Sequence, residues 1–141
     1  MFMIRHLKSL GKQKVKIPLN GILPLMIKII TKPITLSQLA AEAQKTFGDM
    51  VKAVVDVDQA MLAINGELHA DEEAVLIEQG SKQDHLWGIN LYPELYGQVD
   101  WLEFDSMINL RPSRGNASRS VDDPKIQKRI VEIVNKLVIE K

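Results

Sequence analysis

The chain of 141 residues contains no cysteine, which excludes a disulfide framework, a thiol nucleophile and a zinc site built on cysteine. It also lacks the Gly-x-Gly-x-x-Gly fingerprint and the P-loop, so we expect neither a Rossmann fold nor a Walker-type nucleotide site. No apolar run is long enough to span a bilayer, and we expect no membrane association. The absence of cysteine favours a cytoplasmic location, because disulfide-stabilised proteins mark oxidising compartments.

Charge is unevenly distributed along the chain, although the formal net charge is zero. Residues 1–25 contain five of the eighteen basic residues and none of the eighteen acidic residues, which leaves residues 26–141 with a net charge of −5. Apolar residues make up 45% of the sequence, enough for a core in one domain of this length.

The first 25 residues differ in pattern from the rest, because Gly and Pro interrupt every helical or strand-like period. An ordinary strand pattern begins only at Met26. We therefore expect an N-terminal basic extension, residues 1–25, outside an α+β domain of residues 26–141. The alternative is a true basic arm that binds nucleic acid.

Local signals predict five elements after a short strand near residues 27–31. A capping box of Thr35 and Gln38 opens the first helix, and Asp123 followed by Pro124 opens the last. The expected elements are a helix at 35–47, a hairpin of 51–57 and 61–64, a short helix at 71–79, a hairpin of 86–92 and 101–110, and a helix at 124–137. This helix-hairpin-short helix-hairpin-helix order predicts a single α+β domain with a mostly antiparallel sheet and packed helices.

Apolar periodicity also predicts which side chains form the core. On the short helix, the expected apolar positions are Ala74, Val75 and Ile77. On the strand at 101–110, Glu103 and Asp105 share the polar face, which is either solvated or an acid–base pair. The expected core residues are Leu39, Phe47, Val55, Ile89, Phe104, Ile108, Ile130 and Val134.

The segment between the last strand and the last helix carries three arginines, whose forked donors suit phosphate or carboxylate. Its glycine can adopt a positive φ, so that successive N–H groups form an anion-binding nest. The alternative is an arginine-rich turn whose guanidinium groups pair with local acids such as Asp122 and Asp123. The candidate anion-binding residues are Arg111, Ser113, Arg114, Gly115, Asn116 and Arg119.

A second candidate site lies in the segment Gly66–Glu73. Glu67, His69 and Asp71 alternate, and in extended backbone they would point to one side, as ligands of a metal ion. Asp105 on the long strand would complete the set. The alternative is a helix-capping cluster in which His69 is a turn residue.

Three motifs carry a resemblance to a known family, namely GELHADEE at 66–73, LWGINLYP at 86–93 and SMINLRPSRGN at 106–116. With them, the chain resembles an uncharacterised family of small bacterial and archaeal proteins, classified as a domain of unknown function. The resemblance covers about residues 26–138 and implies the same domain limits. It implies no activity and no cofactor.

Function therefore stays open at the level of sequence. The favoured interpretation is a small cytoplasmic binding module whose arginine loop contacts an anionic ligand, such as a phosphate of a nucleotide or nucleic acid. One alternative is a metal-assisted hydrolase that uses Glu67, His69, Asp71 and Asp105. Another is a structural or homo-oligomeric protein without a small-molecule site.

Overall fold

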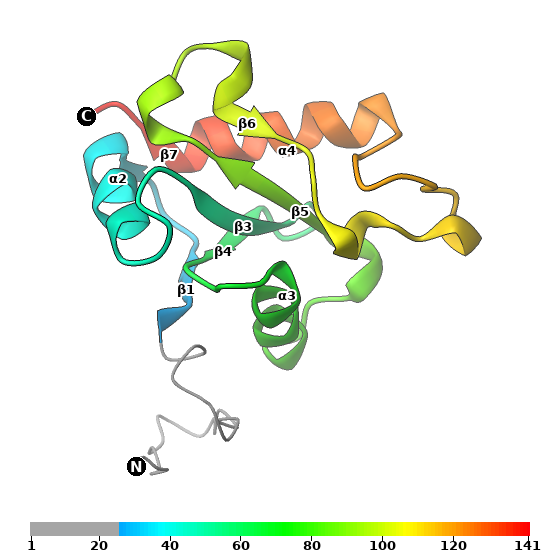
Figure 1. Ribbon diagram of the computed structural model, residues 1–141. Helices are drawn as coiled ribbons and strands as arrows, with labels where there is room; N and C mark the ends of the chain where they lie inside the picture. The colour runs from blue at the N-terminus through cyan, green and yellow to red at the C-terminus, as the bar shows by residue number, and fades with distance from the viewer. Residues whose placement is uncertain (1–25) are drawn as a thin grey trace, which may run out of the picture.

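The centre of the fold is a five-stranded antiparallel sheet with the strand order β1-β4-β3-β5-β6 (Figure 1). The computed structural model describes residues 26–141, so the expected extension of residues 1–25 lies outside the described residues. A smaller sheet pairs β2 (Ile34–Thr35) in parallel with β7 (Val138–Ile139). The strands of the main sheet are β1 (Lys28–Ile30), β3 (Val51–Asp56), β4 (Met61–Ile64), β5 (Leu86–Leu91) and β6 (Leu102–Glu103).

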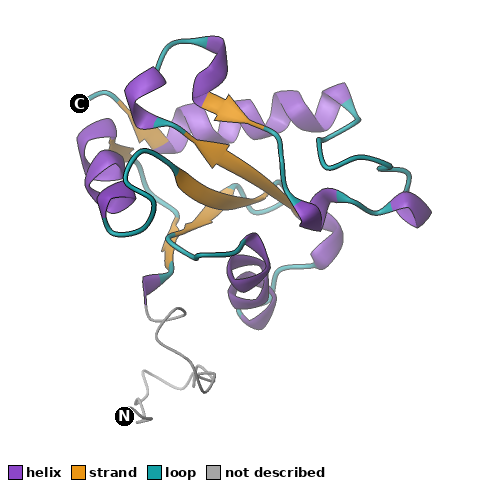
Figure 2. Cartoon of the chain, in the orientation of Figure 1, coloured by secondary structure: helices purple, strands orange, loops and turns teal. Residues whose placement is uncertain are grey.

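Helices cover the two faces of this sheet, and the chain is α+β as predicted (Figure 2). Side chains from α2 (Leu36–Gln44) and α4 (Pro124–Leu137) join one large apolar cluster with alternate residues of β3, such as Val55. The intervening residue Val54 faces the other side, where it joins a smaller cluster with α3 (His69–Glu78). The sheet therefore has a thick apolar side and a thinner side that α3 covers.

The helix starts follow from local hydrogen bonding. The side chain of Thr35 accepts a hydrogen bond from the Gln38 N–H at 3.0 Å, and the side chain of Gln38 accepts one from the Thr35 N–H at 2.8 Å. Asp123 caps α4 by accepting from the Lys125 N–H at 2.8 Å, with Pro124 at the first helical position. Both predicted starts are confirmed, because a capping side chain satisfies N–H groups that the helix itself leaves free.

The predicted long strand at 101–110 is wrong. Only β6 forms there, and the chain then leaves the sheet for a 3-10 turn, η4 (Met107–Asn109). The side-chain oxygen of Ser106 accepts a hydrogen bond from the Ile108 N–H at 3.2 Å and so caps this turn. The remaining 3-10 turns are η1 (Gln83–His85), η2 (Pro93–Leu95), η3 (Val99–Trp101) and η5 (Pro112–Arg114).

The predicted face of the short helix also needs correction. The helix begins at His69 rather than Asp71, and its buried positions are His69, Glu72 and Leu76. Ala74 and Ile77 are exposed, because the face of α3 that packs on the sheet runs through His69, Glu72 and Leu76.

The predicted core is confirmed at Leu39, Val55, Ile89, Ile130 and Val134, which are all fully buried. Phe104 and Ile108 are only half-buried, because the chain has left the sheet where they occur. Phe47 is 42% exposed, since α2 ends before it and its ring lies under the Lys52 ammonium at 5.5 Å.

Burial at these positions leads to a stability prediction. Ile89→Ala removes a fully buried side chain from the middle of β5 and should lower the free energy of unfolding by about 2–5 kcal/mol. Phe47→Ala is the matched control and should cost less than about 1 kcal/mol, as surface substitutions do. Urea denaturation of both variants measures the difference, and equal losses would contradict the assignment of Phe47 to the surface.

Candidate functional site

A cleft of about 530 Å³ opens on the thinner side of the sheet, between the start of α3 and η4. We call it the polar cleft. It joins residues from the GELHADEE and LWGINLYP segments, the segment after β6 and the arginine loop, which are far apart in sequence. It is lined by Met50, Lys52, Leu68, His69, Ala70, Asn90, Tyr92, Glu103, Asp105, Ser106, Met107, Ile108 and Arg119.

The floor of the polar cleft is a row of three side chains across three strands. Lys52 on β3 is the register partner of Asn90 on β5, and Asn90 is the partner of Glu103 on β6. Cross-strand partners in antiparallel sheets share a face, and adjacent strands are about 4.8 Å apart. The row therefore places a cation and an anion roughly 10 Å apart at the backbone, with an amide between them.

Hydrogen bonds fix the acidic end of this row. The Asn90 side-chain N–H donates to Glu103 Oε1 at 2.9 Å and to the Asp105 carbonyl at 3.2 Å. The Tyr92 hydroxyl donates to the same Glu103 oxygen at 3.1 Å. Arg119 Nε donates to Asp105 Oδ1 at 2.7 Å. Oε1 of Glu103 thus accepts two hydrogen bonds. Oε2 accepts none from the described residues.

Two groups in the cleft lack an expected partner among the described residues. Asn90 is 6% exposed, and its side-chain oxygen lies near the His69 ring but accepts no hydrogen bond of normal geometry from residues 26–141. No carboxylate in the same range lies within ion-pair distance of the Lys52 ammonium. The cleft floor therefore offers an acceptor, and a cation whose only described partner is the Phe47 ring at 5.5 Å.

His69 forms part of the cleft wall as a neutral imidazole. Its Nε2–H donates to the Ile89 carbonyl at 2.8 Å, which makes Nδ1 the unprotonated nitrogen. Burial lowers the pKa of His69, an effect that outweighs the opposing hydrogen bond to Ile89, and the nearby charge of Lys52 lowers it further. The ring therefore contributes an acceptor rather than a charge at neutral pH.

A glycine in β5 makes room for this wall. A Cβ atom at Gly88 would lie 2.5 Å from the side chain of Ser106 and 3.1 Å from the ring of His69. Any larger residue would push η4 and α3 away from the sheet. The glycine of the LWGINLYP motif thus sets the width of the cleft.

Next to His69 on the buried stripe of α3 lies a glutamate that is completely buried. Glu72 accepts a hydrogen bond from the Gly66 N–H at 2.8 Å, and its second oxygen has no partner among the described residues. Burial raises the pKa of Glu72 well above its ordinary value of 4.5 and so favours the protonated side chain in the folded protein.

Arg111, Ser113 and Arg114 of the arginine loop line one cavity of about 380 Å³, but the arginine side chains already have partners. Arg111 lies 4.5 Å over the Trp87 ring and donates to backbone carbonyls, including Ile108 at 3.0 Å. Arg114 forms an ion pair with Asp84. Arg119 points into the polar cleft toward Asp105, so the three cations serve three separate acceptors.

The backbone of the loop is also occupied. Gly115 has the expected positive φ of 89°, but its N–H donates to the Pro112 carbonyl at 3.1 Å, and the Asn116 N–H donates to the Arg111 carbonyl at 3.1 Å. Asp122 accepts from the Ala117 N–H at 2.9 Å. Anion binding by a nest would have to break these bonds. The geometry favours the alternative of a structural turn, and anion binding at the loop stays a prediction.

Asn116 has a structural role at the centre of the loop. Its side-chain N–H group donates to the carbonyls of Asn109, Ser118 and Ser120, and its oxygen accepts from the Asp122 N–H at 2.7 Å. Ser113, by contrast, is exposed, and none of the hydrogen bonds in the described part of the chain uses its hydroxyl.

The side chain of Asn109 forms the hydrogen bonds that a neighbouring strand would otherwise make with Gly88. Its side-chain oxygen accepts from the Gly88 N–H at 2.8 Å, while its side-chain N–H donates to the Gly88 carbonyl at 3.0 Å and the Arg119 carbonyl at 3.0 Å. β6 pairs only with Asn90 and Leu91, so this amide completes the sheet edge where β6 has ended. The sequence gives no local signal for such a long-range role.

The expected metal ligands do not come together. Because α3 begins at His69, Asp71 lies about 200° around the helix from it, and the strand-like alternation does not apply. Glu67 is exposed, and only His69 and Asp105 of the four line the polar cleft. Within residues 26–141, no group of three or more His, Asp or Glu side chains could hold a metal ion.

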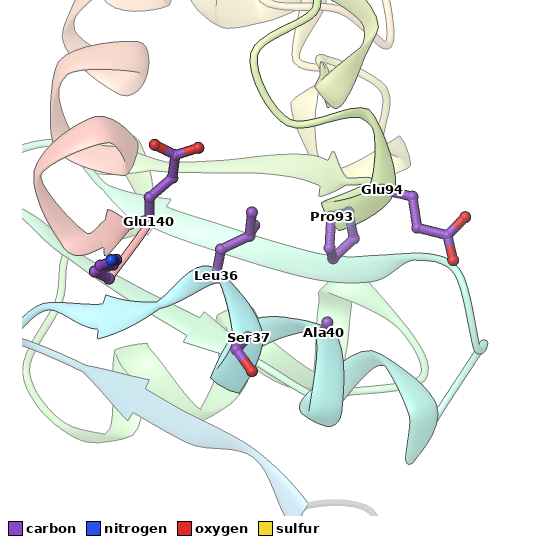
Figure 3. Close-up of a pocket in the computed structure, with 7 residues that line it drawn as sticks. Leu36, Ser37, Ala40, Pro93, Glu94 and Glu140 are labelled. Atoms are coloured by element: carbon purple, nitrogen blue, oxygen red, sulfur yellow. The ribbon is translucent and has the colours of Figure 1, made fainter.

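A second hollow, of about 800 Å³, lies between α2, η2 and the C-terminal end of the chain (Figure 3). Leu36, Ala40 and Pro93 meet at its centre, whereas Glu94 and Glu140 lie at opposite ends. It is larger than the polar cleft but offers no converging polar groups.

These features define a small α+β domain with a polar cleft on one face of an antiparallel sheet. Residues 28–137 match the family described as "Protein of unknown function (DUF5674)", and the chain belongs to this family. No curated protein and no solved structure is similar enough to match the chain. Among residues 26–141, no helix combines the length and apolar character needed to cross a membrane.

The role of Asn109 can be tested by its removal. Asn109→Ala leaves the N–H and the carbonyl of Gly88 without their partner, whereas the Arg119 carbonyl keeps the Ser106 N–H, and each unsatisfied buried group costs about 1–3 kcal/mol. We expect a loss of at least about 2 kcal/mol in urea denaturation. The control is Asn135→Ala, on the exposed face of α4, which should change stability by about 0.5 kcal/mol or less.

Glu72 should make stability depend on pH. Above its ordinary pKa of 4.5 the unfolded chain loses this proton while the folded chain keeps it, so the free energy of unfolding falls as pH rises. The stabilisation is complete below pH 4.5 and is lost at up to about 1.4 kcal/mol per pH unit toward the raised pKa.

Glu72→Gln should remove this slope, whereas the exposed Glu78→Gln should keep it. The measurement is urea denaturation of the three proteins at a series of pH values from 4 to about 8. Parallel curves for Glu72→Gln and the unsubstituted chain would contradict a protonated Glu72.

Proposed function

We propose that the domain is a binding module and that its ligand is a small polar molecule held in the polar cleft. The observation that carries this proposal is Asn90, a buried amide at the cleft floor whose oxygen lies near the His69 ring but has no hydrogen bond of normal geometry among the described residues. Leaving such a group unpaired costs about 1–3 kcal/mol, and native proteins rarely do so without a reason. A donor group on a ligand supplies the missing partner.

The size and lining of the cleft support the same proposal. Its volume of about 530 Å³ lies within the range of small-molecule sites, about 300–1,000 Å³. Leu68 and Met107 at its edge are 57% and 61% exposed, although both are large apolar side chains. A polar floor under an apolar edge is a common arrangement in ligand sites, because the edge excludes water and the floor orients the ligand.

An anionic group on the ligand fits this cleft better than the arginine loop. Lys52 has no carboxylate partner in the described part of the chain, whereas Arg111 and Arg114 already have acceptors. Binding to nucleic acid is less favoured, because Glu103 and Asp105 place negative charge beside the cation. The proposal keeps the cytoplasmic location that the lack of cysteine favours.

A search for binding fragments tests the proposal directly. A library of small polar compounds is added to the ¹⁵N-labelled full chain, and amide shifts are followed by NMR. Shifts should gather at Lys52, Ala70, Asn90 and Ser106. Ala70→Trp fills the cleft from α3 and should abolish them, while Ala74→Trp, one turn away and outside the cleft, should leave them unchanged.

Two results would contradict the proposal. One is a set of compounds whose shifts gather around Leu36 and Pro93 instead of the polar cleft. The other is binding that persists equally in Ala70→Trp and Ala74→Trp.

A further inference from the structure

We propose that the ligand of the polar cleft is a zwitterion of the amino-acid type, with an ammonium and a carboxylate on the same small molecule. This inference rests on the proposed function and specifies the class of ligand. Its basis is the row of Lys52, Asn90 and Glu103, which offers unlike charges at its two ends and an acceptor between them.

The cationic end of the row is built for a carboxylate. The Lys52 ammonium has no carboxylate partner in the described part of the chain, and the first turn of α3 forms the adjacent wall through His69 and Ala70. The N-cap residue of α3 is Leu68, whose apolar side chain cannot form a capping hydrogen bond. The helix dipole favours negative charge at this end, where Asp71 and Glu72 of the first turn also lie.

The anionic end is built for an ammonium. Asn90 and Tyr92 both donate to one oxygen of Glu103, which orients this carboxylate and leaves its second oxygen for a donor on the ligand. The unpartnered oxygen of Asn90 lies beside it as a further acceptor. Asp105 shares its charge with Arg119, so Glu103 is the acid whose charge lacks a cationic partner among the described residues.

Charge balance then selects a dipolar ligand over a singly charged one. A simple carboxylate would pair with Lys52 and place its charge near Glu103, whereas a simple amine would do the reverse. Each would leave the charge at one end of the row without a partner from the ligand. A zwitterion pairs with both ends at once.

The spacing limits the size of the ligand's charged part. The two end strands are roughly 10 Å apart at the backbone, and the side chains of Lys52 and Glu103 fill much of that span. The remaining gap suits an ammonium and a carboxylate on one carbon. The apolar edge formed by Leu68 and Met107 favours an apolar side chain, which makes L-leucine the probe.

The experiment compares three probes on the full chain by calorimetry, with NMR to locate binding. They are L-leucine, 4-methylpentanoate, which lacks the amino group, and 3-methylbutylamine, which lacks the carboxylate. L-leucine should bind at least tenfold more tightly than either analogue. Lys52→Met should weaken L-leucine and the acid but not the amine, and Glu103→Gln should weaken L-leucine and the amine but not the acid.

Matched controls separate charge from general damage. Lys32→Met and Glu78→Gln remove exposed charges outside the cleft and should leave all three affinities unchanged. Thermal unfolding of each variant establishes that it is folded. For a variant that fails to fold, the comparison of the three probes on the unsubstituted chain still decides the matter.

The outcomes distinguish this inference from the proposed function. If L-leucine binds in the cleft no more tightly than its analogues, or if polar fragments bind there and L-leucine does not, the zwitterion is ruled out and the binding module stands. If neither fragments nor probes shift residues of the cleft, both proposals fail.

Discussion

The side-chain amide of Asn109 holds together the part of the molecule that forms the polar cleft. Its oxygen accepts from the Gly88 N–H, and its N–H donates to the Gly88 carbonyl. The main sheet loses its last strand after two residues, and this amide takes over the pairing. The carbonyl of Asn109 in turn accepts from the Asn116 side chain, which closes the arginine loop. Arg119 at the end of that loop reaches back to Asp105 in the cleft. One amide thus connects the sheet edge, the loop and the cleft wall.

The polar groups of the arginine loop mostly bond to other groups of the protein. Its glycine and asparagine look like the elements of an anion nest, yet the nest is filled from within, by Asp122 and by carbonyls of the loop itself. The polar groups that remain available are found instead where β3, β5 and β6 run side by side. In this domain, the charged residues of the loop contribute to the scaffold, and the polar cleft is lined by residues that carry no recognisable motif in the sequence.

Local signals allowed much of the fold to be predicted from the sequence. The caps at Thr35 and Asp123 were correct because each depends on residues within one helical turn. The segment 101–110 misled because alternating apolar residues also suit a chain that turns over a surface, as it does at η4. The row of Lys52, Asn90 and Glu103 was out of reach, since it depends on which strands become neighbours. The predicted metal site required His69 and Asp71 to point to one side in extended backbone. Because α3 begins at His69, both residues are helical and point to opposite faces.

The small parallel sheet has a consequence for how the chain acquires its structure during synthesis. β2, which leads directly into α2, finds its partner in β7, the strand that follows α4 near the other end of the described chain. Pairings between segments so far apart in sequence form slowly, because a long loop must close first. On the ribosome, Ile34 therefore cannot pair with Val138 until all the residues between them have been made. The large apolar cluster, to which α2 and α4 both contribute, is complete only after β2 and β7 have paired.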